Sequence, residues 1–178
     1  GAVVQFESET EVEAAEKTSL EQIDSAIKEH GHDIACLVLE PIQGEGGDNH
    51  FRDEFFVELR RIADENDVML IFDEVQTGIG LTGKMWCFQN TSIVPDIISF
   101  GKKTQVCGIM ATERVDTVPD NVFQTSSRIN STWGGNIVDM VRFTKYLQII
   151  EEENLVNNVN EVAKVLVNEM EKVQAEYP

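Results

Sequence analysis

Two clusters of polar residues follow short apolar runs in this sequence, and their residue types could hold and activate one ligand. The cluster Asp73-Glu74-Val75-Gln76 comes directly after the apolar run at 69–72, and the pair Lys102-Lys103 follows the run at 97–100 after one glycine. In an open parallel sheet, ligands bind beyond the carboxyl ends of the strands. An acid and an amine at the ends of two such strands can therefore share a ligand. The residue types alone leave a second interpretation open, in which a buried carboxylate caps a loop and the lysines lie on the surface.

Apolar runs predict the strands that carry these clusters. Strands are expected at 35–39, 68–72 and 97–100, with a fourth at 106–111. Short continuous apolar runs of this kind are typical of strands that are buried on both faces. Because a helical segment separates the first two runs, their order predicts an α/β fold with a mostly parallel sheet and right-handed crossovers.

Capping residues and apolar periodicity predict the helices. Ser19 and Gln22 form a capping box at the expected start of a first helix, and Gly31 is its expected C-cap. Asp53 is expected to cap a second helix, and two more helices should follow Asn136. The last helix has an apolar stripe that needs a partner, formed by Val159, Val162, Ala163, Leu166, Met170 and Val173.

The composition indicates one globular domain and excludes several partners. Of the 178 residues, 42% are apolar and 26% are charged, which is ordinary for a globular protein. The formal net charge of -18 repels nucleic acid and anionic membranes, so neither is an expected partner. No apolar run could span a bilayer, and the first residues lack the basic start of a signal peptide. Three cysteines without a CxxC pattern predict buried free thiols in the cytoplasm, and three histidines without metal-ligand spacing predict no metal site.

Four segments occur in an order that identifies a family. They are EPIQGEGG at 40–47, LIFDEVQTGIGLTG at 70–83, FGKK at 100–103 and NSTWGGN at 130–136. Together they resemble the class III (omega) aminotransferases, which belong to the fold type I family of pyridoxal-phosphate enzymes. The resemblance covers about residues 33–155. It implies that residues 1–178 form part of the large, cofactor-binding domain, without the N-terminal part of that domain and without the C-terminal small domain.

The resemblance implies pyridoxal 5'-phosphate as the cofactor and assigns residues to it. Asp73 resembles the acid that pairs with the pyridine nitrogen, and Gln76 resembles the group that hydrogen-bonds the phenolic oxygen. Lys103 resembles the lysine that forms the Schiff base and carries a proton between substrate and cofactor. In the family this lysine precedes a glycine-containing turn by a fixed interval, and counting back from Gly108 selects Lys103 over Lys102.

Three further residues receive roles from the same resemblance. Ser131 and Thr132 lie in the segment that reaches across a homodimer interface, where the hydroxyl of Thr132 would bind the cofactor phosphate of the other subunit. Glu45 resembles the switch glutamate, which neutralises an arginine while a distal amine reacts and swings aside for 2-oxoglutarate. Glu40 is expected to be structural.

The segments at 44–51, 101–108 and 126–136 are most similar to the lysine 6-aminotransferases. That similarity implies transfer of the terminal amino group of L-lysine to 2-oxoglutarate, giving 2-aminoadipate 6-semialdehyde and glutamate. The 4-aminobutyrate transaminases are the nearest alternative, and a folded chain that does not hold the cofactor is an alternative of another class. Because Arg128 and Arg142 do not occupy the place of the arginine that binds the 2-oxoglutarate carboxylate, and the phosphate-binding segment is missing, the isolated chain is expected to be inactive.

Overall fold

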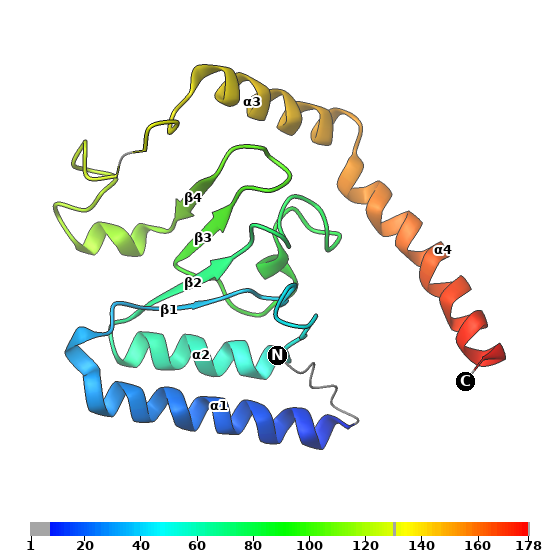
Figure 1. The fold of residues 1–178 in the computed structure, drawn as a ribbon, viewed down its shortest axis with the longest axis horizontal. Coiled ribbons are helices and arrows are strands. Elements are labelled where there is room, and N and C mark those ends of the chain that lie inside the picture. The colour runs from blue at the N-terminus through cyan, green and yellow to red at the C-terminus, as the bar shows by residue number, and fades with distance from the viewer. Residues whose placement is uncertain (1–7, 130, 178) are drawn as a thin grey trace.

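The computed structural model describes residues 8–129 and 131–177. Within these residues one four-stranded sheet has the strand order β1-β2-β3-β4 (Figure 1). Strands β1 (Cys36–Leu39), β2 (Met69–Asp73) and β3 (Ile97–Phe100) are parallel, whereas β4 (Gly108–Ala111) is antiparallel to β3. A mostly parallel sheet is therefore confirmed. Strand β4 reverses because only the short loop 101–107 joins it to β3, and a parallel neighbour would need a longer crossover.

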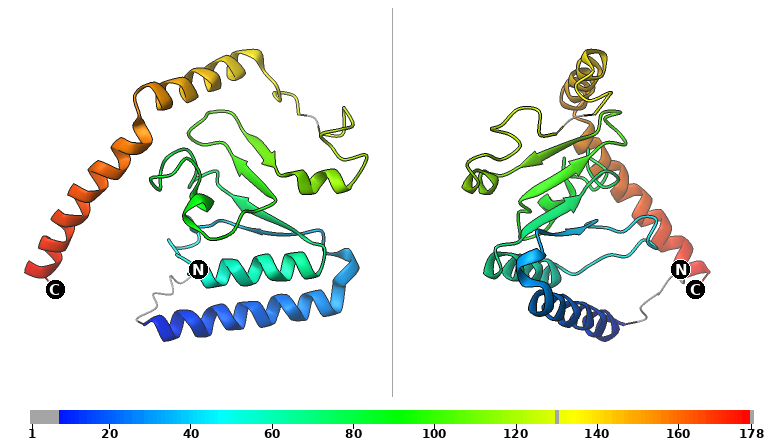
Figure 2. Two further views of the ribbon diagram at one scale, coloured as in Figure 1. Left: turned by 180° about the vertical axis from the view of Figure 1, so that it is seen from behind. Right: turned by 60° about the vertical axis from the view of Figure 1, so that its left-hand side comes forward.

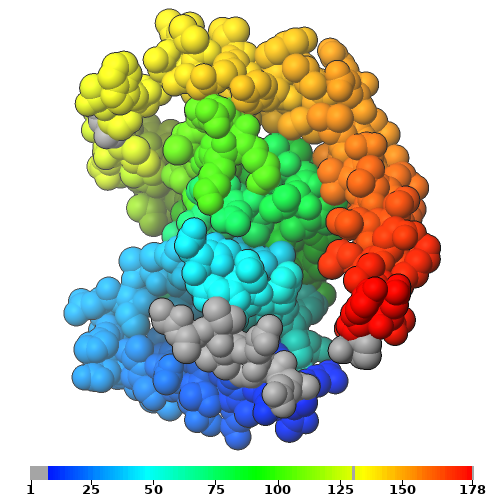
Figure 3. Space-filling model, turned by 45° about the vertical axis from the view of Figure 1, so that its right-hand side comes forward, coloured from blue at the N-terminus to red at the C-terminus, as the bar shows by residue number. Residues whose placement is uncertain are grey.

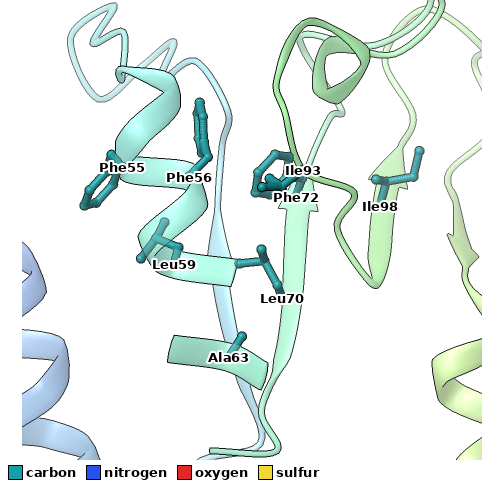
Figure 4. Packing of buried hydrophobic residues seen from close by; sticks show 8 residues of the cluster. All are labelled: Phe55, Phe56, Leu59, Ala63, Leu70, Phe72, Ile93 and Ile98. Carbon is teal, nitrogen blue, oxygen red and sulfur yellow. The ribbon is translucent and has the colours of Figure 1, made fainter. Parts of the chain in front are cut away.

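Helices α1 (Glu9–His30) and α2 (Asp53–Glu65) form two layers on one side of the sheet (Figures 1 and 2). The residues of α2 at helical spacing are buried, and Figure 4 shows Phe56 on the side of this helix that faces the strands. The Phe56 ring lies 5.3 Å from that of Phe72 in β2. The buried cluster consists of Phe55, Phe56, Leu59, Ala63, Leu70, Phe72, Ile93 and Ile98. This core fixes the strands whose ends carry the polar clusters.

Both helix starts differ from the predicted ones. Helix α1 begins at Glu9 and is capped by Ser8, whereas Ser19 lies inside the helix and donates its hydroxyl to the Ala15 carbonyl. The glutamate- and alanine-rich stretch before Ser19 favours helix, so the capping-box pattern there is coincidental. Helix α2 has Arg52 at its N-cap position without a side-chain cap, and the Asp53 carboxylate instead accepts the Ser92 N–H at 2.7 Å. The C-cap at Gly31 is confirmed.

Strand β1 is an edge strand, and its burial differs from the prediction. The side chain of Val38 is 61% exposed, so this strand is not buried on both faces. The helices that pack on the sheet, α1 and α2, lie on the same side, and a strand at the edge has a neighbour on one side only (Figure 2).

The chain continues from β4 through the 3₁₀ turn η3 (Glu113–Thr117) and a loop into two helices. Earlier in the described residues, η1 (Gly31–Asp33) lies between α1 and β1, and η2 (Cys87–Asn90) lies between β2 and β3. Helix α3 (Ile137–Glu152) follows Asn136, as predicted. The Asn136 side chain caps this helix by accepting the Val138 N–H at 2.9 Å.

Helix α4 (Leu155–Glu176) forms an arm along one side of the molecule, orange to red in Figure 3. Its first turns are anchored through the Asn160 side chain, which donates to the Gly83 carbonyl at 3.0 Å. Farther along, Val162, Leu166, Met170 and Val173 are each more than half exposed, so the predicted stripe lacks a cover in the described residues. No helix in those residues is both long and apolar enough to cross a membrane.

Candidate active site

Asp73 ends strand β2 and is held by the neighbouring strand. Its Oδ1 accepts the Ser99 hydroxyl of β3 at 3.0 Å and the Val75 N–H at 2.9 Å. Within residues 8–129 and 131–177, no hydrogen bond to its Oδ2 is found. One carboxylate oxygen is therefore fixed by the protein, while the other has no hydrogen-bond partner among the described residues.

Gln76 lies three residues farther on and brings both lysines to the same place. The Lys102 ammonium donates to the side-chain Oε1 of Gln76 at 2.9 Å, and the Lys103 ammonium donates to the Gln76 backbone carbonyl. The acid cluster and the lysine pair, predicted from two separate strand ends, thus meet at one edge of the sheet. Both lysines are exposed in this chain.

The loop 101–107, which carries the two lysines, is tightly constrained. The Thr104 side chain is buried, and its hydroxyl lies 3.0 Å from the Gly101 carbonyl and 2.7 Å from the Val106 carbonyl. A Cβ at Gly108 would come within 2.5 Å of the Phe100 ring, so only glycine fits there. The glycine from which the lysine interval is counted is therefore required by packing at the end of this loop.

Electrostatics distinguish Lys103 from its neighbours. Desolvation of the ammonium by the surrounding protein and the positive charge of Lys102 lower the pKa of Lys103 below its ordinary value, although the side chain remains exposed, and the Glu74 carboxylate opposes this shift. A lysine that acts as a nucleophile or base must lose its proton near neutral pH. The direction of the shift is the one such chemistry needs.

Glu74 is a site residue that residue spacing does not single out. It is 1% exposed, and its carboxylate accepts the Cys87 N–H at 2.5 Å and the Phe88 N–H at 2.8 Å. Burial raises the pKa of Glu74, although these two N–H groups and the charge of Lys103 oppose the rise. Glu74 therefore ties the loop that carries Gln76 to turn η2. The only sequence signal is an acid directly after Asp73.

The glycine-rich turn after β1 reaches the same cluster. A Cβ at Gly44 would lie 2.7 Å from Oε1 of Gln76, so the turn packs directly on that side chain. Glu45 is the next residue and is exposed, which leaves its carboxylate free to move. The Glu40 carboxylate accepts the Gly44 N–H at 3.2 Å and so holds the turn, in keeping with its expected structural role.

The structure does not bring Ser131 and Thr132 to this cluster. Both are exposed in the loop before α3, beside Trp133, which is 79% exposed. The cysteines are free, but only Cys87 is buried, so the expectation of buried thiols is wrong for exposed Cys107 and half-buried Cys36. Among the described residues, no group of histidine, cysteine, aspartate or glutamate side chains could hold a metal ion.

Comparison with known proteins identifies the family. The model of the class III aminotransferases matches residues 2–178. The chain belongs to the class III aminotransferases. It is 54% identical to the L-lysine-epsilon aminotransferase of Mycobacterium tuberculosis over 165 aligned residues. The alignment covers 93% of this chain and 37% of that protein. It is 47% identical to the enzyme of the same name from Streptomyces clavuligerus and 36% identical to 4-aminobutyrate aminotransferase from Kluyveromyces lactis.

A solved structure of lysine aminotransferase from M. tuberculosis in the internal aldimine form aligns with 99% of this chain and with 41% of the chain in that structure. The TM-score is 0.91 at 51% identity. A transaminase from the marine bacterium Virgibacillus matches with a TM-score of 0.81 at 26% identity. The predicted α/β fold of the fold type I pyridoxal-phosphate transferases is thereby confirmed. The chain spans a little over a third of the length of the curated relatives.

Proposed function

We propose that this chain is the cofactor-holding part of a lysine 6-aminotransferase, which transfers the terminal amino group of L-lysine to 2-oxoglutarate. The products would be 2-aminoadipate 6-semialdehyde and glutamate. One observation carries the proposal: Asp73, Gln76 and the two lysines meet at the carboxyl ends of β2 and β3. The identity of 54% to a protein named L-lysine-epsilon aminotransferase supports lysine as the amino donor.

The residues at this edge fit pyridoxal 5'-phosphate. When bound, the cofactor would act as an electron sink for the substrate carbon that loses its proton. Asp73, with one oxygen fixed by Ser99 and the other not engaged, would hold the ring nitrogen protonated. The side-chain amide of Gln76 would donate to the phenolic oxygen. Both groups lie on one strand end and the loop that follows it, so their separation is set by the fold.

Two adjacent lysines compete for the covalent bond to the cofactor. The interval to Gly108 predicts Lys103, and the lowered pKa of Lys103 supports this assignment. A different observation favours Lys102. Its ammonium, rather than that of Lys103, contacts the side chain of Gln76, which would donate to the phenolic oxygen of the cofactor. Whichever amine forms the bond would, once released, accept a proton at Nζ from the substrate carbon and return it.

We further propose that Glu45 and Thr132 serve the same site, Thr132 and Ser131 through a homodimer. Three solved structures of the M. tuberculosis protein have substitutions at a glutamate, an asparagine and a threonine. Their spacing equals that of Glu45, Asn130 and Thr132 here. The apolar residues exposed around this loop, Trp133 and Ile137, suit an interface. Sedimentation should show a dimer or larger species, and a clean monomer would count against the interface.

The substrate assignment can be tested in a chimera. In the M. tuberculosis L-lysine-epsilon aminotransferase, the segment that matches this chain would be replaced by this chain. The chimera should form glutamate from 2-oxoglutarate with L-lysine as donor, and much less with 4-aminobutyrate. A preference for 4-aminobutyrate would support the alternative donor. A folded chimera that does not bind pyridoxal phosphate would support the non-catalytic alternative. The isolated chain is expected to show no measurable transfer.

A further inference from the structure

Helix α3 contacts the loop that carries the two lysines. The Arg142 guanidinium donates from Nη2 to the Gln105 carbonyl at 3.1 Å, and the same nitrogen donates to the Asp139 carboxylate at 2.6 Å. The next residue of α3 is Phe143, whose ring lies 5.6 Å from the ring of Phe100 at the end of β3. A charged and an aromatic contact thus fix α3 against the base of the loop.

Gln105 is the residue of the loop that most needs an external hold. Its φ is 57°, a left-handed conformation that non-glycine residues rarely adopt and that persists only when surroundings enforce it. Its side chain donates to the Lys102 carbonyl at 3.0 Å. Gln105 therefore connects two points, the Arg142 guanidinium on one side and the backbone of the lysine pair on the other.

We propose that Arg142 is a positioning residue for the lysine pair. From α3 it holds the Gln105 carbonyl, and so keeps loop 101–107 in the shape that presents both amines to Gln76. The inference rests on the proposed function, because it assigns Arg142 to the reaction through these lysines. Helix α3 also begins five residues after Thr132, so one rigid element joins the proposed inter-subunit segment to the lysine loop.

The Arg142 side chain is 40% exposed as a whole, but the burial of one of its nitrogens supports a held rather than a mobile side chain. Its Nε is buried and has no hydrogen-bond partner within residues 8–129 and 131–177. A buried donor without a partner costs free energy, so the remaining contacts of the guanidinium must fix the side chain in place. A freely mobile arginine at the surface would turn this donor to water.

Three variants of the 178-residue chain test the proposal. Arg142→Ala removes the hold, Arg142→Lys keeps a positive donor within reach of the Gln105 carbonyl, and Lys145→Ala removes an exposed charge from the same helix as a control. Hydrogen exchange would be followed by mass spectrometry in peptides from loop 101–107 and from β2. The rate at which pyridoxal phosphate forms a borohydride-stable adduct on the lysine pair would be measured against pH.

Arg142→Ala should raise exchange in the loop about tenfold and leave β2 unchanged, whereas Lys145→Ala should change neither. Arg142→Lys should restore most of the wild-type protection of the loop from exchange. Adduct formation should be slowest in the variant whose loop exchanges fastest. Unchanged loop exchange in Arg142→Ala, or an equal rise in β2, would overturn the proposal. Hydrogen exchange needs no cofactor, so the two failures are distinguishable. A wild-type chain that forms no adduct would contradict the proposed function. The hydrogen-exchange result would still decide whether Arg142 holds the loop.

Discussion

Replacement of Glu74 tests whether a buried carboxylate organises the loop that carries Gln76. Glu74→Ala removes both acceptors and leaves the Cys87 and Phe88 N–H groups without a partner. Each unsatisfied buried donor costs about 1–3 kcal/mol, so the gross loss is about 2–6 kcal/mol. Part of this is offset, because the raised pKa of Glu74 shows that burying its charge is itself unfavourable. We expect a net destabilisation of about 2–4 kcal/mol. Glu74→Gln should lose about half as much, since the amide oxygen can accept one N–H.

Urea denaturation followed by tryptophan fluorescence would measure these losses. Trp86 is a suitable reporter because it precedes Cys87 and its ring lies 5.7 Å from that of Phe100. Glu169→Gln provides the control, since this exposed acid pairs only with Lys172 on the surface of α4, where such pairs contribute about 0–1 kcal/mol. A free energy of unfolding for Glu74→Ala within about 0.5 kcal/mol of wild type would refute the clamping role of the carboxylate, since changes of that size are ordinary for surface sites.

The pH dependence gives an independent check on Glu74. Because its pKa in the folded chain is raised above the ordinary 4.5, the folded chain keeps the proton to a higher pH than the unfolded chain does. Stability contributed by this group is therefore fully present below pH 4.5 and is lost as pH rises through the folded pKa. The advantage of wild type over Glu74→Gln should shrink across that window. An advantage that grows with pH would contradict the raised pKa.

Three further predictions concern the site and the thiols. Because its pKa is lowered, Lys103 should react with an amine-specific reagent with a midpoint below the ordinary lysine value of 10.5, as read by competitive labelling; a midpoint at or above that value would contradict the shift. Asp73→Asn should leave the urea midpoint nearly unchanged but weaken pyridoxal-phosphate affinity at least tenfold, the effect of losing one charge-assisted hydrogen bond of about 1.5–3 kcal/mol; unchanged affinity would remove Asp73 from the site. Burial raises the pKa of Cys87 to about 11, so a thiol reagent at pH 8 should modify exposed Cys107 quickly and Cys87 only on unfolding; equal rates would place Cys87 at the surface.

Local patterns predict much of the sheet and the central part of the site. Asp73, Gln76 and the lysine pair follow apolar runs, and parallel strands place such residues at one edge. The structure brings both lysines into contact with Gln76 at the strand end where Asp73 hydrogen-bonds Ser99, as this rule predicts. Val38 shows the limit, because an apolar strand residue is buried only if another layer covers it, and that depends on the edge position of β1.

Long-range contacts account for the features that patterns do not predict. The bond from Arg142 to Gln105 joins residues 37 positions apart, and no periodicity marks either as a partner of the other. Glu74 is likewise hidden, since its two N–H donors lie in a turn that has no regular pattern. The roles proposed for Ser131 and Thr132 depend on a second subunit, and no local pattern within one chain positions its residues.

The covalent attachment of the cofactor tests the central claim most directly. The chain would be incubated with pyridoxal 5'-phosphate, reduced with borohydride, digested and mapped by mass spectrometry. The adduct should lie on the Lys102–Lys103 pair, and the map would decide between these two amines. Asp73→Asn should lower its yield, whereas the Lys145→Ala control should not. An adduct spread over surface lysines, or none on the pair at saturating cofactor, would contradict the assignment of this edge of the sheet as the cofactor site.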